Sequence, residues 1–157
     1  MTTASSYETG FEKKRGIISV EIRQGYSQVH VMDLEPTLDR RLAVLDAVAH
    51  AQISLDFLKL TTDGLSFLIP ADRSRAIVDC LSGAGYQFEL NEGRSIVMVH
   101  AVNMRDEEGL IAKIVATAIG SGAHIDHLGD MHDRLLIVTE DSRATDLANL
   151  LQERLSA

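Results

Sequence analysis

Tryptophan is absent from this sequence of 157 residues, and aromatic residues of all kinds make up only 4% of it. Proteins that bind single-stranded nucleic acid usually stack the bases on aromatic side chains. The formal net charge of −8 also disfavours a surface that follows a phosphate backbone. We therefore expect no nucleic-acid partner.

Long apolar runs are also missing, because no stretch reaches the roughly 18 apolar residues that a membrane-spanning helix needs. The N-terminal stretch MTTASSYETGFEKKR has no apolar segment of the kind found in secretory signals, and it is typical of a flexible arm over residues 1–15. Cys80 is the single cysteine, which excludes an internal disulfide. These features predict a cytoplasmic protein that does not contact a membrane.

Apolar residues make up 45% of the chain, enough to build the core of one ordinary domain or of two small ones. The hydrophobic period predicts which segments are strands and which are helices. The expected strands are 17–23, 28–32, 53–60, 65–70, 86–90, 96–102, 123–128 and 134–139. The expected helices are 38–51, a second from near Asp72 to Gly83, a third around 111–119 and a fourth around 144–151, capped by Asp141 or Ser142.

The same period predicts which side chains are buried. In the first strand Ile18, Val20 and Ile22 share one face, and Gly25 marks a turn to the next strand. The first helix is expected to bury the stripe Leu38, Leu42, Leu45 and Ala49, and the second helix the stripe Ile77, Cys80, Leu81 and Ala84. Cys80 is therefore interpreted as a small core residue and not as a nucleophile.

The order of elements occurs twice, and a shift of 70 positions overlays the two copies without a gap. His30 then meets His100 and Asp56 meets Asp126. The second copy lacks a fourth strand, whereas the first copy has a spare strand in front of it, at 17–23. Because an unpaired sheet edge is unfavourable, we expect the N-terminal strand to complete the second copy. The predicted fold class is α/β, an α+β sandwich of two ferredoxin-like βαββαβ modules.

Three short stretches carry a resemblance to a known family. NMRDEEGLIAKI (103–114) is similar to the family pattern G-M-R-x-x-P-G-V-A-A-K-I, and both AQISLDFL (51–58) and GAHIDHL (122–128) are similar to G-I-N-I-D-M-I. The leading RGIIS (15–19) is similar to V-T-G-I-A. The chain thus resembles, over about residues 15–155, the regulatory region of aspartate kinases, which is built from two ACT domains.

This resemblance implies two ACT modules, the first over 26–92 and the second over 93–157, with the strand 16–25 completing the second. It implies a non-catalytic protein that senses an amino acid, since no kinase domain, phosphate-binding glycine loop or catalytic lysine motif is recognised. The implied partners are a small amino-acid effector of the lysine or threonine class, a second copy of the chain in a homodimer, and a kinase catalytic subunit. No cofactor is expected.

The resemblance also implies where the effector binds. In the family, a free amino acid lies at an ACT–ACT interface, with its carboxylate on backbone N–H groups at a helix start. Gly109 would let the backbone approach that ligand. The implied effector-binding residues are Met104, Arg105, Asp106, Gly109, Leu110, His124, Ile125 and Asp126.

Two alternatives remain open from the residues alone. The hairpin HIDHLGDMHD (124–133) is rich in possible metal ligands, although a zinc site needs three or four that converge. His30 and His100 are interpreted as half-buried or interface residues, and the histidines of the hairpin as facing solvent. The other alternative is an ACT-like module that only assembles and binds no ligand.

Overall fold

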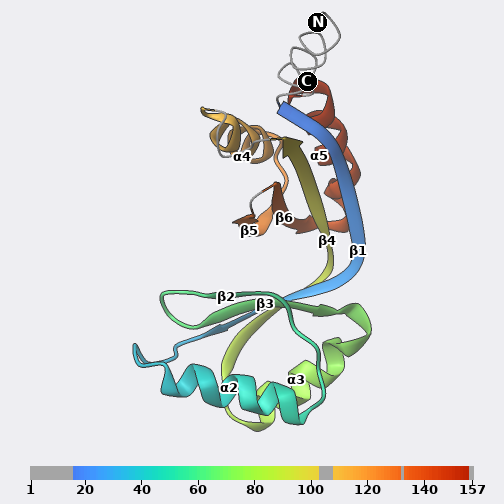
Figure 1. The fold of residues 1–157 in the computed structure, drawn as a ribbon. Helices are drawn as coiled ribbons and strands as arrows, with labels where there is room; N and C mark the ends of the chain where they lie inside the picture. Colours follow the sequence, from blue (N-terminus) through green and yellow to red (C-terminus); the bar gives the residue numbers. More distant parts are fainter. Residues whose placement is uncertain (1–15, 103–107, 132, 156–157) are drawn as a thin grey trace, which may run out of the picture. The chain divides into compact units, whose positions relative to one another are not determined.

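The computed structural model describes residues 16–102, 108–131 and 133–155, which form β-strands and helices (Figure 1). The elements are β1 (Gly16–Met32), α2 (Asp39–His50), β2 (Asp56–Leu60), β3 (Leu65–Pro70), the short 3-10 helix η1 (Ala71–Arg73), α3 (Ser74–Gly83), β4 (Gln87–Val102), α4 (Leu110–Gly120), β5 (Ile125–Asp130), β6 (Arg134–Glu140) and α5 (Asp141–Leu155). The strands are hydrogen-bonded in the order β2-β3-β1-β4-β6-β5. None of the helices described here is long and apolar enough to cross a membrane.

Residues Gln24–Arg94 form one compact unit. It contains the second half of β1, then α2, β2, β3 and α3, and finally the start of β4, so its elements follow the order βαββαβ. The antiparallel register places Val29 opposite Phe67, and both side chains are fully buried beneath the helices. The core of this unit consists of Val29, Val31, Leu34, Val44, Val48, Ile53, Leu65, Phe67, Ile69, Ile77 and Leu81.

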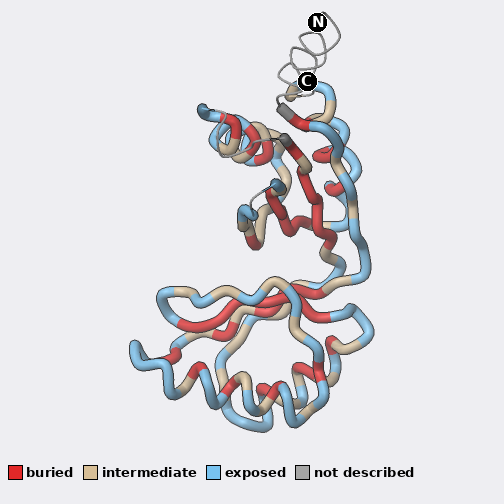
Figure 2. The backbone as a smooth tube through the Cα atoms, viewed as in Figure 1, coloured by how far each residue is buried: buried red, intermediate tan, exposed pale blue. Residues whose placement is uncertain are grey.

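The other compact unit joins the chain up to Arg23 with Ser95–Ala157. Its strands follow the order β1-β4-β6-β5, and α4 and α5 pack with them around a separate core. That core contains Ile17, Val97, Val99, Ala101, Leu110, Ile114, Ala118, Leu135, Ile137, Ala144, Leu147, Ala148 and Leu151 (Figure 2). Val20 and Ile22 also pack against it. The prediction that the N-terminal strand completes the second module is therefore confirmed.

The two strands that link the units are longer than the hydrophobic period of the sequence predicted. The expected turn at Gly25 is wrong, because β1 continues through this residue, and β4 likewise continues from 87 to 102 as one strand. Gly25 has φ +91° and Gly93 has φ +64°. Glycine accepts such angles inside a strand at no steric cost, so the strand continues through it.

At the start of β1, the buried residue lies one position earlier than the sequence predicted. Ile17 is 1% exposed and belongs to the core, whereas Ile18 is 54% exposed, so the prediction for Ile18 is wrong. Val20 and Ile22 lie on the core side as expected. The core positions 17 and 20 are three residues apart. Side chains on one face of a regular strand are an even number of residues apart, so the alternation is broken between these two positions.

The predicted stripe of α2 is also displaced. Leu38 and Leu42 are exposed, and so is Ala49; the buried positions are Arg41, Val44 and Val48. If arginine is taken as a surface residue, the hydrophobic period places the predicted apolar stripe one position away from the observed one. The reason that Arg41 is buried lies in its hydrogen bonds, described below.

Smaller differences concern the ends of elements. The strand predicted at 53–60 begins at Asp56, and the strand predicted at 123–128 runs instead from Ile125 to Asp130. In α3, Ile77 and Leu81 are buried, Cys80 is half-buried at the edge of the core, and Ala84 is exposed just after the helix. The last helix begins at Asp141 directly after β6, where the Asp141 carboxylate accepts a hydrogen bond from Ser95 Oγ at 2.5 Å.

Candidate functional site

The start of α4 is formed by a glycine in a left-handed conformation. Gly109 has φ +78°, its carbonyl accepts the N–H of Lys113 at 2.9 Å, and a Cβ added to it would meet no atom of the described residues within 4 Å. The space above this residue is therefore open, as a backbone contact with a ligand requires. Leu110, the next residue, is 3% exposed and packs its side chain into the core, so only its backbone is available here.

Three of the predicted effector-binding residues, Met104, Arg105 and Asp106, lie outside the described residues. The open glycine at the helix start is nevertheless placed as the sequence suggested. A helix start of this kind offers N–H groups that have no acceptor within the helix, together with the positive end of the helix dipole. Both features favour an anionic ligand group.

The second set of predicted residues lies at the start of β5. His124 Nε2 lies 3.1 Å from Asp126 Oδ1, and the Asp126 side chain is only 3% exposed whereas that of His124 is 67% exposed. The backbone here is fixed on both sides, because the His124 N–H donates to Glu140 Oε1 and Thr139 Oγ1 donates to the His124 carbonyl. The predicted pair is thus brought together as a sheltered carboxylate beside an exposed imidazole.

Ile125 lies between these two residues and packs against the core of the unit. The next residue, Asp126, lies where the pairing of β5 with β6 shifts its register, between Ile125 and His127. Ile125 holds the start of β5 in place and offers no polar group to a ligand.

The two sets of residues lie apart within one chain. Helix α4 contains 11 residues, which corresponds to a rise of about 16 Å. Gly109 precedes this helix, and His124 follows it after a short turn, so the two lie at opposite ends of α4. One small ligand therefore cannot contact both sets within a single chain.

Comparison with known proteins gives matches at the level of structure. No protein-family model matches the chain, and no curated protein matches it. The regulatory subunit of aspartate kinase from Thermus flavus superimposes with a TM-score of 0.79 at 14% sequence identity, covering 88% of this chain and 98% of that one. The structure of aspartokinase alpha and beta subunits gives 0.73 at 20% identity, covering 87% and 97%.

The chain has the fold of the aspartate kinase regulatory subunits. Its two units accordingly have the ACT-type fold that the sequence motifs implied. A third similar structure, E. coli aspartokinase III in complex with lysine and aspartate, gives a TM-score of 0.65 at 15% identity; the match covers 88% of this chain and 33% of that longer one.

The matching loop in the first ACT module is closed by an internal contact. Arg41, 5% exposed, donates hydrogen bonds to five backbone carbonyls. They belong to Glu35 and Thr37 in the loop before α2 and to Thr61, Thr62 and Gly64 in the turn between β2 and β3. A buried guanidinium is tolerated because its donors are satisfied in this way.

Sequence reasoning missed Arg41, although a signal was present. Arg41, Val44 and Val48 follow helical spacing, so the valines alone point to the face on which the arginine lies. The position 70 residues later is Ile111, which has no donors to offer. The first loop is thus tied to its neighbouring turn by a side chain of its own helix, whereas the isoleucine at the matching position of the second module cannot make such hydrogen bonds.

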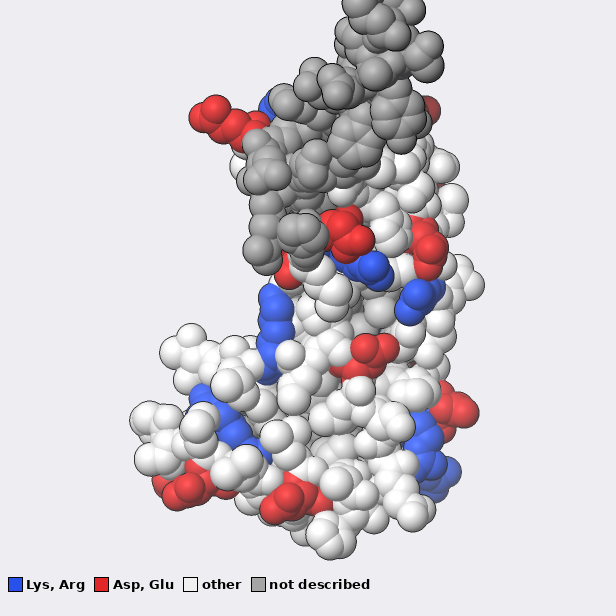
Figure 3. All heavy atoms as spheres, in the orientation of Figure 1, with Lys and Arg blue, Asp and Glu red and all other residues white. Residues whose placement is uncertain are grey.

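The metal-binding alternative receives little support from the geometry. Over 16–102, 108–131 and 133–155 no group of three or more His, Cys, Asp or Glu side chains is placed to hold a metal ion. His127, expected to face solvent, is 5% exposed, so that expectation is wrong; His132 lies outside the described residues. On the face shown in Figure 3, acidic and basic side chains are interspersed and do not gather into one charged field.

Proposed function

We propose that this chain is a non-catalytic regulatory protein that binds a small amino acid of the lysine or threonine class and controls an aspartate kinase catalytic subunit in the cytoplasm. The fold carries this proposal, because the chain matches a regulatory subunit over 98% of the length of that subunit. Support for a kinase partner comes from the match to aspartokinase alpha and beta subunits. Support for an amino-acid effector comes from the match to a lysine complex.

The effector would bind through the residues at the two ends of α4. Its carboxylate would accept hydrogen bonds from the first N–H groups of the helix, where Gly109 leaves the backbone open. Its ammonium group would contact the carboxylate of Asp126 beside His124. Arg105 and Asp106 precede the glycine in sequence and complete the proposed site. Because these groups lie at opposite ends of one helix, the ligand would lie at an ACT–ACT interface between two copies of the chain.

A homodimer follows from that arrangement and has independent support. Strand β2 is an edge strand, and Leu58 and Leu60 on it are 44% and 63% exposed. Exposed apolar residues on a sheet edge favour pairing with another strand. The same observation favours a second candidate function, an ACT-type module that only assembles and binds no ligand.

Regulation would require a difference in effector affinity between two arrangements of the dimer. A coupling free energy of about 1–3 kcal/mol is sufficient for a useful switch. The effector changes the populations of the two arrangements only by as much as its binding free energies to them differ.

A thermal-shift screen against the twenty amino acids, followed by calorimetry, tests the proposal. A ligand that binds only the folded form raises the melting temperature. We expect lysine or threonine to do so and to change the activity of an aspartate kinase catalytic subunit mixed with this chain. If no amino acid binds while light scattering still shows a dimer, the assembly function replaces the regulatory one.

A further inference from the structure

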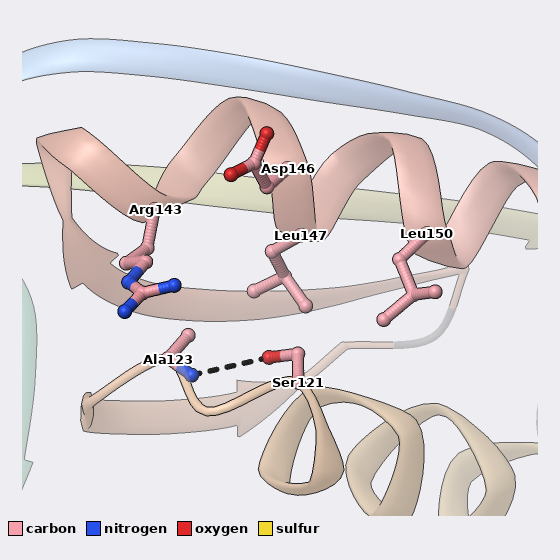
Figure 4. A pocket seen from close by; sticks show the side chains of 6 residues that line it. All are labelled: Ser121, Ala123, Arg143, Asp146, Leu147 and Leu150. Atoms are coloured by element: carbon pink, nitrogen blue, oxygen red, sulfur yellow. Dashed lines mark hydrogen bonds between the residues drawn. The ribbon is translucent and has the colours of Figure 1, made fainter.

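A hollow separate from the effector site lies in the second ACT module, between the turn that follows α4 and one side of α5 (Figure 4). Its volume is about 230 Å³, and it is lined by Ser121, Ala123, Arg143, Asp146, Leu147 and Leu150. Figure 4 shows Leu147 and Leu150 pointing from α5 toward the turn, with Arg143 beside Ala123 at one end. The hollow thus has an apolar floor with a cation at its end.

The charged groups at the hollow are available to a ligand. Within the described parts of the chain, Arg143 and Asp146 form no hydrogen bond or ion pair. They lie one turn apart on α5, and Figure 4 shows Arg143 pointing toward the turn and the Asp146 carboxylate pointing away from it. A planar guanidinium is suited to bind a carboxylate through two parallel hydrogen bonds. A carboxylate next to it suits an ammonium group.

The wall opposite α5 is fixed in place by its own hydrogen bonds. Ser121 Oγ donates to the Ala118 carbonyl at 2.6 Å and accepts the N–H of Ala123 at 3.2 Å. Gly122 has φ +84°, which completes the tight turn. Since Ser121 is used within the turn, the recognition groups are those of α5, and the turn supplies a preformed wall.

We propose that this hollow binds a free amino acid with an aliphatic side chain. The α-carboxylate lies on Arg143 and the side chain covers Leu147 and Leu150, while the exposed Asp146 side chain rotates toward the α-ammonium. Its volume is below the roughly 300–1,000 Å³ of pockets for drug-sized molecules, which matches a ligand of amino-acid size. The site lies in one module and so requires no dimer, unlike the proposed effector site.

Titration of the full chain with L-leucine, followed by amide chemical shifts in NMR, tests this inference. Isocaproate, which lacks the ammonium group, and isoamylamine, which lacks the carboxylate, are titrated in parallel up to about 10 mM, enough to detect millimolar dissociation constants. We expect leucine to shift the signals of 121–123 and 143–150. Isocaproate should bind more weakly at the same place, and isoamylamine should give no shift there.

Variants then separate the two charges. Arg143→Gln should weaken leucine binding tenfold or more, and Asp146→Asn should weaken leucine but not isocaproate. Arg154→Gln and Glu153→Gln, on the same helix outside the hollow, are the controls and should leave affinity unchanged. All four positions are exposed, so the fold should persist.

Either of two results overturns the inference: no shift at 121–123 and 143–150 with leucine, or equal affinity in Arg143→Gln. Shifts confined to Gly109 and 124–126 would also overturn it while leaving the proposed effector site intact. Conversely, binding in the hollow with no amino acid at Gly109 would support this inference and contradict the placement of the effector.

Discussion

His30 Nε2 lies 3.1 Å from Asp63 Oδ1, which joins β1 to the turn between β2 and β3. Thr61 Oγ1 donates to the same carboxylate oxygen at 3.0 Å. A shift of 70 positions places His100 and Asp133 at the matching positions of the second module. There a hydrogen bond from Arg134 lowers the pKa of Asp133, and the charge of His100 adds to the lowering. Both modules therefore set a first-strand histidine near an acid of the hairpin turn.

Acid should destabilise the first module through Asp63. The hydrogen bond from Thr61, and then that from His30, lower the pKa of Asp63. The stabilisation is fully present above the unfolded pKa of about 3.9, and it is lost as pH falls through the lower folded pKa. Asp63→Asn should therefore lower the urea midpoint at pH 7, and its difference from the parent chain should shrink toward pH 3. Asp79→Asn, at an exposed position of α3, is the control; a difference independent of pH would contradict the prediction.

Neighbouring isoleucines at the start of β1 provide a matched test of the shared strand. Ile17 is 1% exposed in the core of the second module, and Ile18 is 54% exposed. Ile17→Ala should cost about 2–5 kcal/mol of unfolding free energy, because it leaves a cavity. Ile18→Ala should cost less than about 1 kcal/mol, since a surface change has a small effect. Equal losses in urea unfolding would show that β1 is not seated in this core.

Replacement of Arg41 should be among the most damaging changes in the first module. Arg41→Met keeps much of the side-chain volume but removes the donors to five backbone carbonyls. Buried carbonyls without partners are unfavourable, and we expect a loss of about 3–5 kcal/mol. Arg75→Met, on the exposed side of α3, should change stability little. Similar values for the two variants, measured by chemical denaturation, would contradict the structural role of Arg41.

Gly109 requires a substitution that respects its backbone. Gly109→Ala would raise stability if Gly109 had ordinary helical dihedral angles, but its φ is +78°. We expect a loss of about 1–2 kcal/mol, because an L side chain is strained there. Asparagine tolerates this conformation better, so Gly109→Asn should stay folded and still cover the open backbone. Calorimetry should then show effector affinity reduced tenfold or more.

The control for this substitution is Gly85→Asn, because Gly85 also has φ +78° with no atom near its added Cβ. It lies in the first module, whereas the residues of the proposed site belong to the second. The two variants should lose similar stability, and only Gly109→Asn should lose binding. Unchanged affinity in Gly109→Asn would remove this glycine from the effector site.

Thiol labelling should distinguish the folded from the unfolded chain at Cys80. The side chain is half-buried against the core, and burial raises the pKa of the thiol. Partial burial limits the access of the reagent, and the raised pKa lowers the reactive thiolate fraction at pH 8. Labelling of the native chain should therefore be several times slower than labelling in urea, though not abolished. Equal rates in the two conditions would place the thiol on an open surface.

The sequence predicted the connection of elements better than their faces. The position of the N-terminal strand was predicted by counting strands in the two copies. The second copy lacks one strand, and the first copy has one to spare. Its buried face was missed by one residue, because Ile17 and Ile18 are chemically identical and only packing separates them. The inner face of α2 was missed because the burial of Arg41 depends on carbonyls from distant turns, which no local pattern contains.

The candidate site was predictable to a similar extent. The position of Gly109 at a helix start and the proximity of His124 to Asp126 both followed from the motifs. The left-handed angle of Gly109 and the shelter of Asp126 are set by surrounding structure. The hollow beside α5 had no sequence signal, since its lining residues are ordinary members of a helix and a turn.

The sharing of β1 between two cores sets an order in which the chain can fold during translation. Ile17 leaves the ribosome before any part of the first module, yet its partners in the core include Leu151, near the other end of the sequence. The first module, Gln24–Arg94, has all of its strands once β4 has been made. The leading half of β1 then remains without its partner core until the rest of the chain has been synthesised. Contacts over so long a separation form slowly, so we expect the second module to fold last and to be the region from which aggregation begins.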